Sequence, residues 1–112
     1  MEILPAVKSA VGGAIAVMMD GGIEHGADIA VSRCLGADLA FFGRITLYGA
    51  AAGGREGIKR VIDLLRQDIS SLQGQLGCAS YDQLKKDLLF DPVGESRESS
   101  TPRSRVLREY LV

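Results

Sequence analysis

Apolar and polar positions along the chain fall into blocks that predict helices and strands in turn. Leu4–Val11 has apolar residues at helical spacing, and the Gly12 and Gly13 that follow predict the end of a helix. Residues 14–19 are a continuous apolar run without alternation, as expected of a strand that is covered on both faces. The chain is therefore predicted to open with a helix and a buried strand.

A second helix and strand follow in the same order. Residues 27–35 carry an apolar helical stripe, and Asp28 lies near the expected N-terminal end of that helix. Gly36 stands where many helices end in the left-handed backbone conformation. Residues 39–42 form another uninterrupted apolar run, which predicts a second strand.

The next part of the chain is predicted to be helical. Residues 46–52 form a short helical segment that ends at Gly53 and Gly54. A long amphipathic helix is predicted over residues 56–76, because its apolar residues recur at steps of three and four. These residues are Ile58, Val61, Ile62, Leu65, Ile69, Leu72 and Leu76. Residues 81–89 predict one more short helix.

The composition changes abruptly after Pro92. Residues 94–105 are rich in Ser, Arg and Glu with almost no apolar residue, so they bury too little surface to offset the entropy cost of ordering. We expect a structured unit over residues 1–92 and a disordered tail over residues 93–112. Within this tail, the sequence predicts at most one turn of helix, at residues 106–112.

The predicted order of elements is typical of α/β architecture with parallel strands and right-handed crossovers. Two parallel strands do not make a sheet that can stand alone, and both strand segments are apolar on both faces. The pattern therefore indicates one part of a larger α/β unit.

Composition and charge narrow the classes of function. The 112 residues include 13 Lys or Arg and 14 Asp or Glu, with a formal net charge of -1. The basic residues do not gather into a stripe, which argues against nucleic acid as a partner. No apolar run approaches the ~20 residues that span a bilayer, so we expect a cytoplasmic protein without a membrane segment. Cys34 and Cys78 have no metal-ligand spacing, which argues against a metal site and a disulfide framework.

The candidate chemistry lies in the turns after the two strands. Asp20, Gly21 and Gly22 follow the first strand, and Gly43 and Arg44 follow the second. An acid at the end of a strand, glycines that let the backbone approach a ligand, and a following helix N-terminus together predict a phosphate cradle. The simpler alternative is an acid that caps a βα turn and an arginine on the surface.

Six motifs stand in order along the chain. They are Met-Met-Asp-Gly-Gly-Ile at 18–23, Gly-Ala-Asp-Ile at 26–29, Leu-Gly-Ala-Asp at 35–38, Gly-Arg at 43–44, Leu-Tyr-Gly at 47–49 and Ala-Ala-Gly-Gly at 51–54. Together they resemble the C-terminal part of FMN-dependent 2-hydroxy-acid oxidoreductases, the family of glycolate oxidase, lactate oxidase and mandelate dehydrogenase. Single motifs of this kind recur in other phosphate-binding barrels, whereas their joint order and spacing are specific.

The resemblance implies that the two strands are the seventh and eighth of a TIM (β/α)8 barrel. The chain would be the C-terminal portion of that barrel, with about two βα units plus C-terminal helices. FMN is the implied cofactor: the acid at Asp20 would hold its ribityl chain, backbone N–H groups around Gly22 and Gly43 would approach its phosphate, and Arg44 would pair with that phosphate. Gly21, Ile23 and Glu24 complete the implied cofactor-binding set.

Glu24 departs from the family's pattern, which has an arginine at this position. The change removes charge-assisted hydrogen bonds of about 1.5–3 kcal/mol each and brings a carboxylate near a phosphate dianion. We expect either that Glu24 turns toward solvent or that flavin affinity falls sharply. A protonated His25 would compensate in part.

The resemblance also implies that catalytic residues of the family are missing from this sequence. The family's catalytic His-x-x-Arg pair precedes the matching segment and has no counterpart here, so no catalytic residue is assigned. The main hypothesis is a C-terminal fragment of an FMN-dependent enzyme that oxidises an L-2-hydroxy acid to a 2-oxo acid, inactive by itself. Such a fragment would be split from an N-terminal barrel partner or come from a truncated gene. One alternative is a degenerate, non-catalytic half-barrel that acts only by self-association or by docking on another protein. Another is a phosphate-binding barrel of the inosine monophosphate dehydrogenase type.

Overall fold

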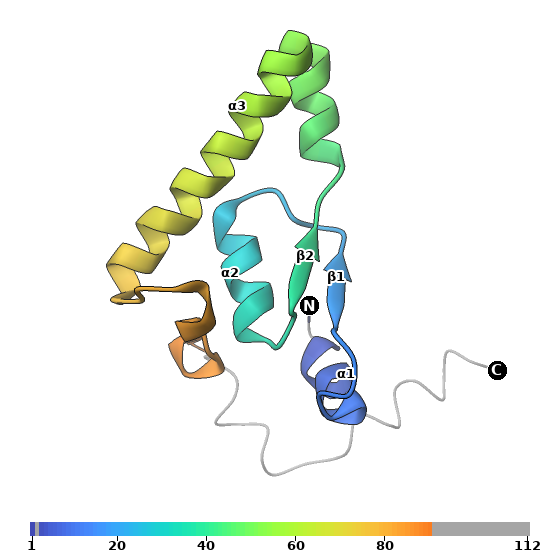
Figure 1. Cartoon of the computed structure of the whole chain (residues 1–112), viewed down its shortest axis with the longest axis vertical. Helices are drawn as coiled ribbons and strands as arrows, with labels where there is room; N and C mark the ends of the chain where they lie inside the picture. Colours follow the sequence, from blue (N-terminus) through green and yellow to red (C-terminus); the bar gives the residue numbers. More distant parts are fainter. Residues whose placement is uncertain (2, 91–112) are drawn as a thin grey trace, which may run out of the picture.

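The described part of the chain alternates helix and strand, as the sequence predicts. The computed structural model describes residues 1 and 3–90, so the predicted tail over residues 93–112 lies outside the described residues. The elements are α1 (Leu4–Val11), β1 (Met18–Asp20), α2 (Gly26–Cys34), β2 (Leu39–Phe41), α3 (Arg44–Leu76) and the 3-10 turns Tyr81–Gln83 and Lys86–Leu88 (Figure 1). The α/β class is thereby confirmed for the described residues.

The two strands pair in parallel, with Met18 opposite Leu39 and Asp20 opposite Phe41. The first strand is shorter than predicted, because residues 14–17 lie outside it. A strand forms where a neighbouring backbone accepts and donates its hydrogen bonds, and β1 pairs only with β2 among the described residues. The apolar run alone therefore overestimated the length of this strand.

The sheet is covered on one face only. Met18, Leu39 and Phe41 expose 56%, 52% and 51% of their surface on the open face. Met19 and Ala40 point to the other face and pack against an apolar cluster. None of the described elements lies over the open face, in keeping with the expectation from the sequence that these apolar strands need neighbours from a larger α/β unit.

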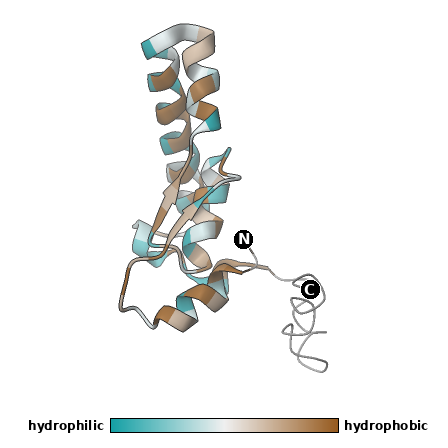
Figure 2. Ribbon diagram, turned by 90° about the vertical axis from the view of Figure 1, so that its right-hand side faces the viewer, coloured by the Kyte–Doolittle hydropathy of each residue, from teal (hydrophilic) through white to brown (hydrophobic). Residues whose placement is uncertain are grey.

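Three small apolar clusters hold the described elements together, and the first two include Met19 of β1. The first contains Leu4, Val17 and Ala37, the second contains Ile23, Ile29 and Leu65, and the third contains Ala30, Cys34 and Leu84. Figure 2 shows that α3 alternates apolar and polar stretches, as expected of an amphipathic helix. None of the described helices is long and apolar enough to cross a bilayer.

Helix α3 reverses direction at Gly53 and Gly54, whose backbone angles are not helical, so its two arms correspond to the two predicted helices (Figure 1). The arms approach closely at Gly49 and Gly57, because a Cβ atom on Gly49 would lie 2.7 Å from the carbonyl oxygen of Gly57. Gly77, in the left-handed conformation with φ 69°, ends the second arm. The glycines of this region therefore shape the hairpin.

The helix predicted over residues 81–89 is wrong. This segment forms two separate 3-10 turns, and Leu84 between them has an extended backbone. The Leu84 side chain is 2% exposed and belongs to the third apolar cluster. The extended backbone that buries the Leu84 side chain therefore stands where a continuous helix was predicted.

Gly26, the first residue of α2, presses against α3. A Cβ atom on Gly26 would lie 2.7 Å from the backbone nitrogen of Ile69 and would overlap the Cβ atom of Asp68. We expect Gly26→Ala to lower the free energy of unfolding by about 1–3 kcal/mol, because the two helices must move apart.

The matched control for this variant is Gly74→Ala in the second arm of α3. A Cβ atom on Gly74 would meet nothing within 4 Å, so alanine should raise the free energy of unfolding by about 0.5–1 kcal/mol. Urea unfolding followed by circular dichroism measures both values. A Gly26→Ala protein as stable as the wild type would contradict the close approach of α2 and α3.

Candidate functional site

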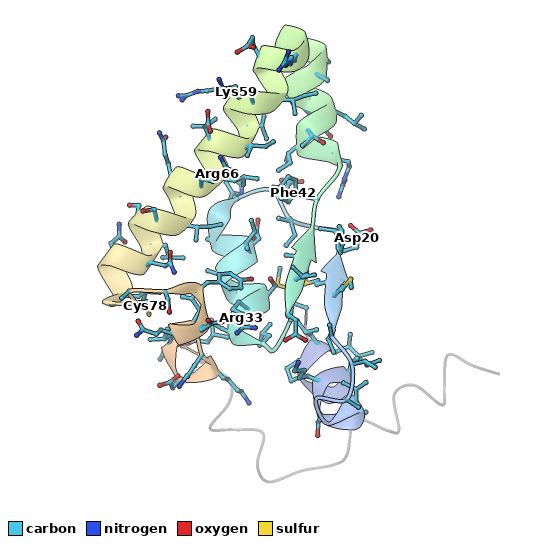
Figure 3. All side chains as sticks on the ribbon, in the orientation of Figure 1. Asp20, Arg33, Phe42, Lys59, Arg66 and Cys78 are labelled. Atoms are coloured by element: carbon cyan, nitrogen blue, oxygen red, sulfur yellow. The ribbon has the colours of Figure 1, made fainter. Side chains whose placement is uncertain are left out.

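The candidate residues meet at the carboxyl ends of the two strands. Asp20 ends β1, and its register partner Phe41 lies at the end of β2, so the two following turns start side by side. Gly21 and Gly22 lie in the first turn and Gly43 lies in the second. Figure 3 shows Asp20 at this edge of the sheet. Parallel pairing thus brings together the two turns that the sequence singled out.

The first turn leaves its backbone accessible. Gly21 and Gly22 have φ angles of 94° and 73°, in the left-handed region that favours glycine. A Cβ atom added to either residue would meet no described atom within 4 Å beyond its chain neighbours. Asp20 is exposed beside them. The polar group of a ligand can therefore approach this turn without steric hindrance.

Ile23 differs from the other candidate residues. Its side chain is 4% exposed and packs with Ile29 and Leu65 in the second apolar cluster. The side chain therefore anchors the end of the turn to the core, and only the backbone of Ile23 is left to face a ligand.

The N-terminus of α2 already holds a carboxylate of its own. The Oδ2 atom of Asp28 accepts hydrogen bonds from the backbone N–H groups of Glu24 at 2.9 Å and His25 at 2.8 Å. Partial burial opposes ionisation, but these two N–H donors and the His25 ring outweigh it and lower the pKa of Asp28. The N–H groups of Glu24 and His25 are thus engaged by an anion from within the chain. The sequence indicated Asp28 near this helix end but not these hydrogen bonds.

The N-terminus of α3 has no such cap. Gly43 precedes the helix, and no described side chain hydrogen-bonds to its first turn. The Thr46 hydroxyl instead donates to the Gly43 carbonyl at 2.6 Å. Arg44, the first residue of the helix, is exposed. Because a helix N-terminus carries a partial positive charge and free N–H donors, this second turn is the better position for an anion.

Glu24 is exposed at the rim of the site. It lines a shallow groove of about 330 Å³ together with Ile45, Tyr48 and Leu64. The other side of the groove consists mainly of apolar side chains of α3. The Glu24 carboxylate is exposed to solvent and forms no ion pair with a described cation. A negative charge therefore stands at the position where the family resemblance implies an arginine.

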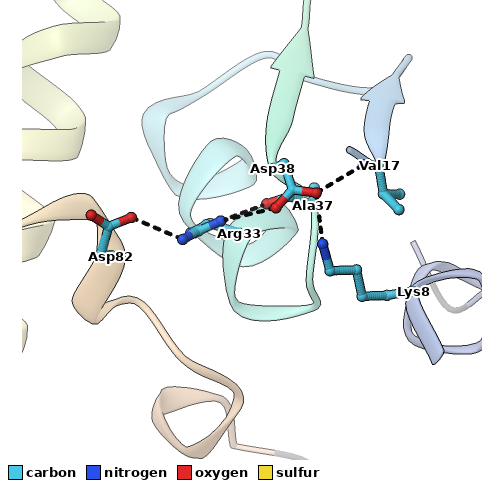
Figure 4. A network of polar contacts seen from close by, with 6 residues as sticks. All are labelled: Lys8, Val17, Arg33, Ala37, Asp38 and Asp82. Atoms are coloured by element: carbon cyan, nitrogen blue, oxygen red, sulfur yellow. Dashed lines mark hydrogen bonds and ion pairs between the residues drawn. The ribbon is translucent and has the colours of Figure 1, made fainter. Parts of the chain in front are cut away.

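A second polar cluster, at the amino ends of the strands, was not predicted (Figure 4). The Oδ2 atom of Asp38 lies 2.6 Å from Lys8 Nζ and accepts the backbone N–H of Val17 at 2.8 Å. Arg33 contacts the other Asp38 oxygen at 3.6 Å and donates to Asp82 at 2.9 Å. The hydrogen bond from Lys8 is the main reason that the pKa of Asp38 is lowered. This cluster ties α1, β1 and α2 to the segment after α3, and the Leu-Gly-Ala-Asp motif was its signal in the sequence.

Comparison with known proteins gives matches over most of the chain. A family model described as FMN-dependent dehydrogenase matches residues 1–91. The pre-mycofactocin synthase of Mycobacterium tuberculosis is 40% identical over 105 residues, which are 94% of this chain and 26% of the relative. The 2-hydroxyacid oxidase 2 of Mus musculus is 36% identical over 89 residues, which are 80% of this chain and 25% of the relative. The chain thus spans about a quarter of the length of the curated relatives that it matches.

Solved structures are similar as well. The monotopic membrane protein (S)-mandelate dehydrogenase is 38% identical with a TM-score of 0.76, covering 80% of this chain and 24% of that one. A mandelate oxidase variant is 32% identical with a TM-score of 0.72, covering 76% of this chain and 26% of that one. These neighbours are TIM-barrel flavoenzymes, so the described α/β unit corresponds to a part of such a barrel.

Asp28 is expected to control the acid stability of the first turn. Because its pKa is lowered by folding, its contribution is complete above the unfolded value of about 3.9 and is lost as the pH falls through the lower folded value. Asp28→Ala should lower the free energy of unfolding at pH 7 by about 0.5–2 kcal/mol, as for other lost caps. The loss of stability on acidification to about pH 3 should be smaller in this variant than in the wild type.

Asp63→Ala is the control for helix propensity and for loss of a carboxylate. Asp63 contacts Arg66 at 3.8 Å on the exposed side of α3, so its removal should change stability by less than about 1 kcal/mol. Urea titrations at both pH values measure the two variants. Equal stabilities of Asp28→Ala and wild type at pH 7 would rule out this role for Asp28.

Proposed function

The chain belongs to the FMN-dependent dehydrogenase family, and from this premise we propose that it is the C-terminal portion of a (β/α)8 barrel that binds FMN. In this proposal β1 and β2 are the last two strands and residues 1–92 form the barrel part. One observation carries the proposal. The parallel register puts the Asp20 turn and the Gly43 turn at one carboxyl edge, where barrels of this fold bind phosphate.

The proposed phosphate position is the uncapped N-terminus of α3. Arg44 supplies a bidentate cation there, and the backbone N–H groups of Gly43 and Gly22 supply neutral donors. Asp20, exposed on the open face of the sheet, accepts hydrogen bonds from ribityl hydroxyl groups. The engaged N-terminus of α2 favours this assignment, because the Asp28 carboxylate would repel a second anion.

FMN, when bound, supplies the two-electron oxidation chemistry of the family. We propose that the completed barrel oxidises a 2-hydroxy acid to a 2-oxo acid, and that these residues bind and orient the cofactor without touching the reacting carbon. The 112 residues contain one histidine, His25, and no His-x-x-Arg pair. Catalytic groups therefore have to come from the remaining strands of the barrel, which would also cover the exposed Met18, Leu39 and Phe41.

A second candidate function has one observation in its favour. The alignment with pre-mycofactocin synthase extends over 105 residues, whereas that with 2-hydroxyacid oxidase 2 extends over 89. The longer match reaches into the residues after the family model ends at 91. On this alternative the same cofactor site would serve a reaction that yields pre-mycofactocin in place of a 2-oxo acid.

Glu24→Arg should strengthen FMN binding. The wild-type chain is expected to bind FMN weakly or not at all, because the Glu24 carboxylate repels the phosphate. Arginine replaces this repulsion with a charge-assisted hydrogen bond, which predicts a gain of about tenfold or more in affinity. Quenching of flavin fluorescence measures the gain for FMN. Riboflavin, which lacks the phosphate, is the control ligand and should show no gain.

Arg44→Gln, introduced into the Glu24→Arg protein, should abolish most of the gained affinity for FMN. Its matched control is Arg66→Gln, which removes another exposed arginine of α3, on the second arm. Equal losses for the two variants would exclude the proposed phosphate position. FMN binding by none of these proteins would exclude a cofactor site that this chain forms by itself.

A further inference from the structure

We propose that Cys34 and Cys78 form a dithiol site that a peroxide converts into an intrachain disulfide between the end of α2 and the segment after α3. The proposal concerns residues outside the phosphate site and does not depend on flavin binding. Both cysteines are free in the structure.

The two thiols share one apolar cluster. Cys34, the last residue of α2, is 7% exposed and packs with Ala30 and Leu84. Cys78, which follows the Gly77 cap of α3, is half-buried and packs against the same cluster. Its Sγ atom lies 3.8 Å from the carbonyl oxygen of Gln83, the residue before Leu84. Both sulfur atoms therefore face the short segment around residues 83–84.

Polar contacts hold this segment against the last turn of α2. Arg33, the neighbour of Cys34, donates to Asp82 at 2.9 Å and lies 5.2 Å above the centre of the Tyr81 ring. Figure 3 shows Cys78 at the end of α3, and Figure 4 shows the contact between Arg33 and Asp82. These contacts hold the segment after α3, which contains Cys78, against the end of α2, which contains Cys34.

The two thiols have different environments, which assigns each a role. Cys78 is the more accessible and meets an oxidant from solvent first. Burial raises the pKa of the Cys34 thiol, and the neighbouring Cys78 and Asp87 add to this effect. Burial and the raised pKa therefore keep Cys34 a protonated thiol that escapes direct oxidation, and in the proposal it loses its proton only as it reacts with an oxidised Cys78.

The reaction balances with hydrogen peroxide as the oxidant. The Cys78 sulfur attacks one peroxide oxygen, the O–O bond breaks, and the products are Cys78 sulfenic acid and water. The Cys34 sulfur then attacks the Cys78 sulfur, the S–O bond breaks, and the departing hydroxide takes the Cys34 proton to form a second water. Two thiols and one peroxide thus give one disulfide and two waters.

The disulfide would close a loop that contains β2 and all of α3. Cross-linking restricts the unfolded chain and pins the end of α3 to α2, so the oxidised protein should be more stable. The spacing of the cysteines in the sequence gave no sign of such a pair, because tertiary packing alone brings them together.

The test uses the full chain treated with hydrogen peroxide in stoichiometric steps. We expect the free thiols to fall from two to none, the intact mass to fall by two hydrogen atoms, and a linked peptide containing Cys34 and Cys78 to appear in digests. The midpoint of thermal unfolding should rise and should return to its starting value after reduction. The yield should not depend on protein concentration.

Two matched variants separate this site from ordinary cysteine oxidation. In Cys34→Ala, Cys78 should stop at the sulfenic acid, which dimedone traps, or form dimers between chains. In Cys78→Ala, Cys34 should stay reduced while the chain is folded. If Cys34→Ala fails to fold by circular dichroism, Cys34→Ser replaces it. Wild-type protein that gives only dimers, sulfinic acid or unlinked peptides would overturn the proposal.

Discussion

The parallel pairing of β1 with β2 is the constraint on which the rest of the structure depends. Three residue pairs set the register, and this register fixes what lies at each end of the sheet. At the carboxyl ends it joins the turn after Asp20 to the turn before Arg44. At the amino ends it lets the single carboxylate of Asp38 reach both the Val17 N–H and the Lys8 ammonium. One short ladder thus organises both the candidate site and the main polar cluster.

The two βα turns at the carboxyl edge look alike in sequence but differ in electrostatics. In the first, the Asp28 carboxylate neutralises the positive end of α2 and lowers its own pKa in doing so. In the second, no described side chain caps α3, so its N–H donors and Arg44 remain available. This difference gives the proposed phosphate position a physical basis beyond the family motifs. Glu24 would weaken the proposed site through charge and not through shape, since Gly21 and Gly22 leave the backbone of the turn accessible.

The open face of the sheet is apolar and uncovered, in contrast to the polar turns at its carboxyl edge. Met18, Leu39 and Phe41 each expose about half of their surface, and the buried clusters behind the sheet are small. Hydrogen bonds and ion pairs around Asp38 and Arg33 add to the contacts between elements. In the proposed barrel, the remaining strands would cover this face.

The sequence by itself determined the helical segments of α1, α2 and α3, the order of elements and the family. The bounds of α1 and the reversal at Gly53 and Gly54 were predictable because helical period and glycine conformation are local properties. Only the tertiary structure decided which groups become neighbours. It shortened β1, buried Ile23 at the end of the turn that follows β1, and brought Cys34 and Cys78 to one cluster. Strand length, burial and side-chain pairing depend on contacts between residues far apart in the chain, and the periodicity of a single sequence does not contain them.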